Sequence, residues 1–157
     1  MYLHRLLASV AAVFVAACGN GKAEQRPVDE NVSQATLPEH LCDLVPQPDA
    51  ERIMGKALVQ ERNDGSGCHY QDARGTAGTG LWVFHNVLQV GDQCRLTRGS
   101  EPLSGLGGEA CMAPEGMYTH IVFSGGGQTF EVIAPGKGKA SELATAVAKV
   151  MLSKLGS

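Results

Sequence analysis

Five short runs rich in apolar and β-branched residues, each bounded by turn-forming residues, predict five β-strands in the chain. The runs cover residues 57–60, 68–71, 81–90, 117–124 and 128–134. Asn63, Asp64 and Gly65 separate the first two runs, and three consecutive glycines at 125–127 separate the last two. Because such residues favour tight hairpin turns, two antiparallel strand pairs are expected.

The spacing of apolar residues changes to a helical period near the end of the chain. Apolar residues at helical spacing form one stripe, and they are Leu143, Val147, Val150, Met151 and Leu155. Ser141 is placed to cap this helix. This stripe predicts an amphipathic C-terminal helix.

Two shorter helices are expected before the first strand. Thr36 and Glu39 have the spacing of a capping box, which favours a helix over residues 37–44, and a second helix begins near Pro48 and ends at Gly55. Residues 94–106 are polar and predict a loop. The predicted fold class is therefore α+β: an antiparallel sheet of about five strands with helices packed on one face.

The first 17 residues have a different pattern. Arg5 precedes an apolar run over residues 6–17 that is interrupted by Ser9 and is shorter than the roughly 20 residues that span a bilayer. This pattern is typical of a signal peptide. The run ends in Val15-Ala16-Ala17-Cys18, which resembles the lipobox of bacterial lipoproteins. The resemblance implies cleavage before Cys18, acylation of Cys18 and anchorage to a membrane, whereas an ordinary signal peptide followed by a chance cysteine is the alternative.

Composition divides the rest into a tether and a folded part. Residues 18–35 are polar, charged and small, so they are expected to form a lipidated cysteine and a flexible tether. Residues 36–157 are expected to form a single globular domain. The chain has 157 residues and a net charge of −3, with 13 basic and 16 acidic residues, so no basic excess favours nucleic acid as a partner.

Location follows from the same resemblance. The expected location is the cell envelope, with the membrane as a partner through the lipid anchor. Gly19 follows the cysteine where aspartate would favour the inner membrane in enterobacterial sorting. This indicates the outer membrane facing the periplasm in a host with two membranes, and the outer face of the plasma membrane otherwise.

Cysteine count adds a second prediction. Once Cys18 is assigned to the lipid, four of the five cysteines remain, an even set that favours two disulfides outside the cytoplasm. Three pairings are possible. Cys42–Cys68 and Cys94–Cys111 are favoured because each joins segments that are adjacent in the expected topology. A zinc site or a redox site is disfavoured, since no two of these cysteines lie close together in the sequence.

A family resemblance covers residues 41–155. Four motifs occur in order: Cys42-Asp43-Leu44-Val45, Ile53-Met54-Gly55, Cys68-His69-Tyr70 and Gly105-Leu106-Gly107-Gly108-Glu109-Ala110. Their order resembles a broad group of small bacterial lipoproteins of unknown function that is abundant in actinobacteria. The resemblance implies an α+β envelope domain and a Cys42–Cys68 bond, and it implies no reaction. Tyr70 and Gly108 depart from the tryptophan and aspartate that are common in the group, and Cys94 with Cys111 is an additional pair.

Three features could carry chemistry. Gly105 to Ala110 match the nucleotide-binding pattern G-x-G-x-x-A, but the preceding residues are polar and Pro114 follows, so a tight turn entering a strand is expected. His69, His85 and His120 each lie in a predicted strand, and they would form a metal site only if those strands are neighbours with matching faces. Trp82 and Phe84 share one face of a strand. They are expected in the core, and they would form a binding surface if that face is uncovered.

Taken together, these features predict a lipid-anchored, cell-envelope protein that is not an enzyme and acts as a binding or structural interaction module, without a cofactor, a metal or a nucleotide. An envelope protein partner is expected, and the edge of the sheet offers strand addition as one mechanism. Two alternatives remain open. One is a carrier of a small apolar ligand in a cavity between sheet and helix. The other is an envelope hydrolase or metalloenzyme that uses His69, His85 or His120.

Overall fold

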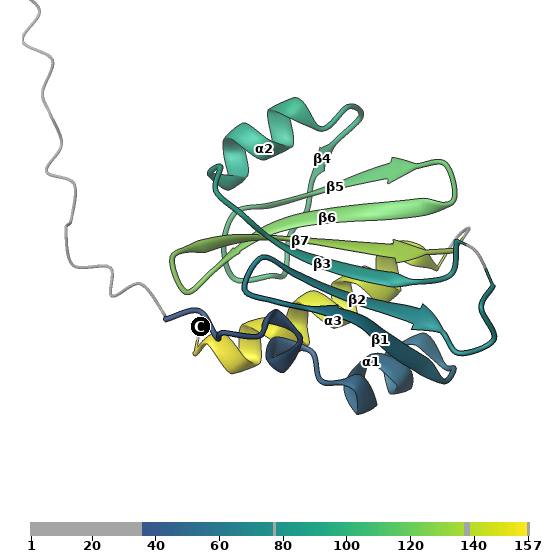
Figure 1. Ribbon diagram of the computed structural model, residues 1–157. Helices are drawn as coiled ribbons and strands as arrows, with labels where there is room; N and C mark the ends of the chain where they lie inside the picture. The colour runs from purple at the N-terminus through teal and green to yellow at the C-terminus, as the bar shows by residue number, and fades with distance from the viewer. Residues whose placement is uncertain (1–35, 77, 137–138, 157) are drawn as a thin grey trace, which may run out of the picture. The chain divides into compact units, whose positions relative to one another are not determined.

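A seven-stranded antiparallel sheet lies at the centre of the computed structural model (Figure 1), which describes residues 36–76, 78–136 and 139–156. The strands are β1 Leu58–Asn63, β2 Gly67–Asp72, β3 Leu81–Asn86, β4 Glu101–Pro102, β5 Ala110–Glu115, β6 Tyr118–Gly125 and β7 Gln128–Pro135, in the order β1-β2-β3-β7-β6-β5-β4. The helical elements are the 3-10 helix η1 Leu41–Leu44 and the α-helices α1 Gln47–Met54, α2 Val90–Leu96 and α3 Ala140–Leu155. The predicted signal peptide, Cys18 and tether lie outside the described residues.

The α+β class and the antiparallel sheet are confirmed, but the strand count of about five is wrong. The structure adds β4 and β5, and the strand predicted over 81–90 ends at Asn86. The loop predicted over 94–106 contains the end of α2 and all of β4. β5 has the weakly patterned sequence ACMAPE, and its strand conformation is stabilised by pairing with β6 along its whole length.

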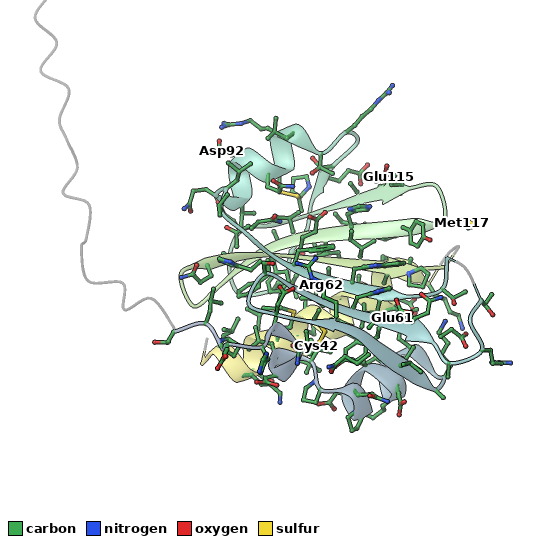
Figure 2. All side chains as sticks on the ribbon, in the orientation of Figure 1. Cys42, Glu61, Arg62, Asp92, Glu115 and Met117 are labelled. Atoms are coloured by element: carbon green, nitrogen blue, oxygen red, sulfur yellow. A yellow bond between two sulfur atoms is a disulfide. The ribbon has the colours of Figure 1, made fainter. Side chains whose placement is uncertain are left out.

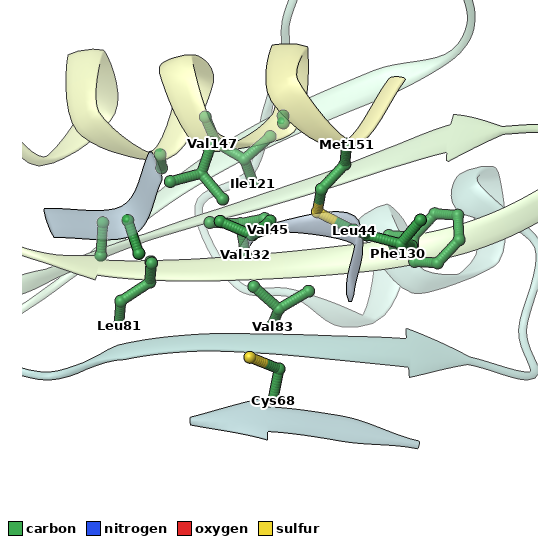
Figure 3. Packing of buried hydrophobic residues seen from close by; sticks show 14 of the residues in the cluster. Leu44, Val45, Cys68, Leu81, Val83, Ile121, Phe130, Val132, Val147 and Met151 are labelled. Carbon is green, nitrogen blue, oxygen red and sulfur yellow. The ribbon is translucent and has the colours of Figure 1, made fainter. Parts of the chain in front are cut away.

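The hydrophobic core lies between α3 and one face of the sheet. Strands β3, β6 and β7 alternate, so that every second side chain faces the helix. Figure 3 shows Val147 and Met151 of α3 pointing toward Ile121 and Val132 of the sheet, and all four side chains are fully buried. η1 closes the core at β2, where the Tyr70 hydroxyl donates a hydrogen bond of 2.8 Å to the Val45 carbonyl oxygen.

Small residues let α3 approach the sheet closely. Ala144 and Ala148 are fully buried, whereas Leu143 and Leu155 of the predicted stripe pack only at the edge of the core. Gly125 has the same role on the sheet, because a Cβ atom there would lie 2.8 Å from Leu152 Cδ2. The helix also begins at Ala140, one residue before Ser141, so Ser141 is not its cap.

Glycines form the predicted hairpin turn between β6 and β7. Gly126 and Gly127 have φ angles of +55° and +75°, the left-handed region that a two-residue type I′ turn requires at both positions. Gly55 ends α1 with φ of +67°, as expected for a helix stop. The first predicted helix, by contrast, is reduced to the four residues of η1, because His40 rather than Thr36 precedes it and provides no side-chain cap.

α2 lies on the face of the sheet opposite to α3, so the expectation that the helices pack on one face is wrong. Its residues Val90 and Cys94 pack against Cys111 and Val122. Val122 alternates with Ile121 and Phe123 along β6, and it therefore points away from the main core. Among the described residues, no helix is long and apolar enough to cross a membrane.

Two disulfides join these layers, and they are the two pairs favoured in the sequence analysis. Cys42–Cys68 attaches η1 to β2 inside the main core, with a Cα–Cα distance of 5.0 Å. Cys94–Cys111 attaches α2 to β5 on the opposite face, with a Cα–Cα distance of 6.0 Å. The second bond therefore fixes a helix on the sheet and does not close a loop between two strands.

We expect the two disulfides to differ in what they stabilise. Replacing Cys94 and Cys111 by alanine should lower the free energy of unfolding by about 3 kcal/mol on the chain-entropy model. It should also speed amide exchange in α2 far more than in β6, because a seven-residue helix held by a small cluster is not stable alone. Hydrogen exchange measured by mass spectrometry checks this.

The matched control is the double alanine variant at Cys42 and Cys68. It should lose a similar amount of stability while α2 keeps its protection relative to β6. Equal protection of α2 in both variants would show that the Cys94–Cys111 bond does not hold this helix.

Candidate functional site

The side of the sheet opposite α3 carries a cluster of aromatic and ionisable side chains that α2 leaves uncovered. Trp82 and Phe84 of β3 lie on this side because they alternate with the buried residues Leu81 and Val83. The same alternation places three more residues on this side: Ile133 of β7 and Tyr118 and His120 of β6. Two glutamates flank the cluster, Glu61 from β1 and Glu115 from β5 (Figure 2). We call this surface the open face.

Trp82 is at the centre of the open face. Its ring stacks on the imidazole of His69, with a centroid distance of 4.7 Å and an interplanar angle of 10°. Tyr118 meets it edge-on at 5.5 Å. Both Trp82 and Phe84 are only partly buried and lie outside the two core clusters, so the expectation that they belong to the core is wrong. This part of the face is uncovered, which is the condition under which a binding surface was the alternative prediction.

Two adjoining hollows cross the open face. The first, of about 370 Å³, is lined by Trp82, Phe84, Glu115, Tyr118, His120 and Ile133. The second, of about 660 Å³, lies toward the end of α2, where Leu96 and Arg98 line it together with Glu131. Glu115 and His120 line both hollows, so the two hollows meet at these residues, and we call the two together the groove.

His120 is held between two carboxylates in this groove. Its Nδ1 lies 2.8 Å from Glu131 Oε1, and its Nε2 lies 2.9 Å from Glu115 Oε2. The hydrogen bond with Glu131 raises the pKa of His120 although partial burial opposes the shift, and the same hydrogen bond lowers the pKa of Glu131. Asn86 donates a further hydrogen bond of 3.3 Å to Glu131. With an acceptor at each ring nitrogen, the geometry favours the doubly protonated imidazolium.

A second histidine is held by a carboxylate on the other side of Trp82. His69 Nδ1 lies 3.0 Å from Glu61 Oε2. The pairing of β1 with β2 shifts between Gln60 and Arg62, which marks a β-bulge at Glu61. Bulges redirect side chains, and here the bulge accompanies the placement of Glu61 beside His69. His69 Nε2 is buried and has no hydrogen-bond partner among the described residues.

The three histidines singled out in the sequence do not come together. His69 and His120 lie on the open face, whereas His85 lies on the core side, where its ring is 5.8 Å from that of Phe130 and its Nε2 is 3.0 Å from Gln128 Oε1. Within residues 36–76, 78–136 and 139–156, no group of three or more His, Cys, Asp or Glu side chains is placed to hold a metal ion. The signal that sequence reasoning missed is the pair of glutamates, Glu115 and Glu131, that lies around His120.

The glycine-rich motif forms a turn that enters a strand, as expected. Gly105 and Gly107 have φ angles of +89° and +78°, and β5 begins at Ala110. Leu106, between the glycines, is buried in the main core. The motif therefore positions β5.

Each sheet edge has one feature that limits the addition of a strand. At β1, Gln47 donates a hydrogen bond of 2.8 Å to the Leu58 carbonyl oxygen, and the Leu58 amide donates one of 3.0 Å to Glu51. At the other edge, β4 has only two residues. The backbone of β1 is therefore occupied at Leu58, and the opposite edge strand is very short, which limits the length of strand that could be added there.

Comparison with family models, curated proteins and solved structures finds no significant match to this chain. The resemblance to small bacterial lipoproteins thus stays a prediction from sequence motifs. The function must be inferred from the geometry of the open face.

We expect Glu131 to control the protonation of His120. Replacing Glu131 by glutamine should lower the pKa of His120 toward its ordinary value of about 6.5, because the strongest contact that favours the charged ring is lost. Glu115→Gln is the matched control and should produce a smaller fall, because Glu115 is 77% exposed. An NMR titration of the imidazole protons measures both values. Equal falls in the two variants would contradict the assignment of Glu131 as the main partner.

The same pair should make stability depend on pH. Because the pKa of His120 is raised on folding, its contribution is present below the unfolded value of about 6.5 and is lost as the pH rises through the folded value. Because the pKa of Glu131 is lowered, its contribution is present above about 4.5 and is lost as the pH falls through the folded value. The stability difference between wild type and Glu131→Gln should therefore be greatest between about pH 4.5 and 6.5. Urea unfolding across pH 4 to 9 checks this.

Proposed function

We propose that this protein is a non-catalytic binding module of the cell envelope, anchored by a lipid on Cys18, and that the open face is its binding surface. The observation that carries the proposal is the placement of Trp82, Phe84 and Tyr118 on the side of the sheet that α3 does not cover. A sheet face left to solvent normally carries polar side chains. Aromatic side chains gathered there are instead typical of an interface, where tryptophan and tyrosine contribute most to binding.

The ionisable groups of the open face support binding better than catalysis. Both ring nitrogens of His120 contact carboxylates, an arrangement that holds protons and orients the ring. His69 contacts Glu61 through one nitrogen and stacks on Trp82 through its ring. These contacts make the floor of the groove rigid, which lowers the entropy cost of binding a partner.

A carrier for a small apolar ligand receives less support. The centre of the interface between α3 and the sheet is filled by side chains that pack directly, including Phe123, Phe130 and Met151, all fully buried, and the hollow beside α3 lies at its margin, where Leu103 and Met112 line it. The hollows described above lie instead on the open face and are exposed to solvent. A surface for a macromolecular partner is therefore favoured over an internal cavity.

Site-specific photo-cross-linking tests the binding surface. A photoreactive phenylalanine analogue placed at Phe84 in the full-length chain should capture a partner in intact cells of the source organism. The matched control carries the analogue at Glu142, an exposed residue of α3 on the other side of the sheet, and should capture little. Capture from Glu142 and none from Phe84 would place the interface elsewhere and overturn the proposal.

Stability measurements separate a binding surface from a core. Phe84→Ser should cost clearly less free energy of unfolding than the loss of a fully buried ring, because part of the Phe84 side chain is already exposed to solvent. Phe130→Ala removes a fully buried ring and should cost about 3–5 kcal/mol. Chemical unfolding of both variants makes the comparison. A loss at Phe84 as large as that at Phe130 would mean that Phe84 serves the fold and not a partner.

The anchor is tested by intact mass. Protein extracted from membranes should begin at Cys18 and carry acyl chains, and its mass should rise by four hydrogens when two disulfides are reduced. Cys18→Ala should keep the disulfides and lose the acyl mass. A wild-type chain found unprocessed and without lipid would overturn the anchor while leaving the binding surface intact.

A further inference from the structure

We propose that the open face binds a basic segment of a partner protein, one that presents a lysine or arginine beside a large apolar side chain. This inference rests on the proposed function and names the chemistry of the partner. Three features of the groove point to such a partner: its apolar floor, the charges at its margins and its elongated form.

The floor of the groove provides a site for the apolar side chain. Trp82, Phe84, Tyr118 and Ile133 line the first hollow, whose volume of about 370 Å³ exceeds that of any single side chain. Each of these four residues is partly buried and partly open to solvent. Inserting an apolar side chain would remove the remaining apolar surface from water, at about 25 cal/mol per Å².

Carboxylates lie on both sides of that floor. Glu61, beside His69, is 52% exposed, and Glu115, beside His120, is 77% exposed. Glu131 is a third carboxylate, largely buried at the base of the second hollow. Because two of the three remain accessible, a cationic group placed next to Trp82 can reach a carboxylate on either side.

The balance of charge along the groove is negative. Arg98 is the one arginine or lysine among the described residues that line the two hollows, and His120, which lines both, adds a positive charge when it is protonated. Arg62, which lies near Phe84 over Gly67, is neutralised by Asp64 at 2.7 Å. Glu115 and Glu131 line the hollows and Glu61 flanks them beside His69. These three carboxylates outnumber Arg98 by two charges, and by one charge when His120 is protonated. Charge complementarity therefore favours a cationic partner over an anionic one.

The form of the groove favours a polypeptide over a glycan. The two hollows share Glu115 and His120 and continue from Trp82 toward the end of α2, where Leu96 is 72% exposed. An extended segment of several residues can contact both. His69 covers one face of Trp82, which reduces the aromatic surface that a sugar ring could stack on.

Tryptophan fluorescence of the protein monitors this site directly, because Trp82 is the only tryptophan in the sequence. The experiment titrates the full-length lipidated chain, in micelles of a non-ionic detergent, with three synthetic octapeptides and follows Trp82 fluorescence. One peptide alternates lysine and leucine, one alternates lysine and serine, and one alternates glutamate and leucine. The shift in Trp82 emission should give a dissociation constant for the lysine–leucine peptide that is at least tenfold lower than for the other two peptides. Added salt should weaken its binding.

Two single variants test the charges. Glu61→Gln and Glu115→Gln should each weaken the lysine–leucine peptide by about tenfold, which corresponds to roughly 1.4 kcal/mol. Glu142→Gln, on the opposite side of the sheet, is the matched control and should leave the affinity unchanged. Glutamine keeps the size of the side chain, and Glu61 and Glu115 are exposed, so both variants are expected to fold.

Several outcomes would overturn the inference. The first is equal affinity for the lysine–serine and lysine–leucine peptides, which would show that the apolar floor is not used. The second is tighter binding of the glutamate–leucine peptide than of the lysine–leucine peptide. The third is binding of a tetrasaccharide of N-acetylglucosamine without binding of any peptide. Failure of all three peptides, while the analogue at Phe84 still captures a partner in cells, would reject this chemistry and keep the open face as the binding surface. Failure of both experiments would reject the proposed function as well.

Discussion

The packing of α3 against one face of the sheet determines what every second residue of the central strands can do. Ile121, Phe123, Phe130 and Val132 face the helix and are fully or almost fully buried. Because side chains alternate along a strand, the residues between them must point to the other face. The position of Trp82 on the open face is therefore a direct consequence of burying Leu81 and Val83 under the helix, and a shift of one residue in the register would reverse both faces.

α2 turns that second face into a groove. Seven residues are too few for a stable isolated helix, and α2 stays on the sheet through Val90 and the disulfide between Cys94 and Cys111. The helix covers the end of the face over β5 and β6 and leaves the part over β3 and β7 open. By holding α2 in this position, the disulfide sets the boundary between the covered and the exposed part of the face. The second hollow lies at this boundary.

The open face remains compatible with water because its aromatic residues are interleaved with paired polar groups. His69 stacks on Trp82 and bonds Glu61, and His120 lies between Glu115 and Glu131. These contacts pair His69 Nδ1 and both ring nitrogens of His120 close to apolar rings, where an unpaired group is costly, whereas His69 Nε2 has no hydrogen-bond partner among the described residues. They also hold the rings in place, which would lower the entropy cost of binding at the proposed surface.

Local patterns in the sequence determined the elements whose signals are contained within a few residues. The glycines at 125–127 specify the turn between β6 and β7, Gly55 ends α1, and helical spacing specifies α3. The even set of cysteines indicated two disulfides, and both favoured pairs occur. By contrast, β5 and α2 have weak patterns of their own, because β5 is stabilised by pairing with β6 and α2 by a disulfide to β5. Whether the face with Trp82 and Phe84 is buried or open depends on which side α3 packs and how far α2 extends. Those contacts join residues far apart in the chain, and only the tertiary structure decided them.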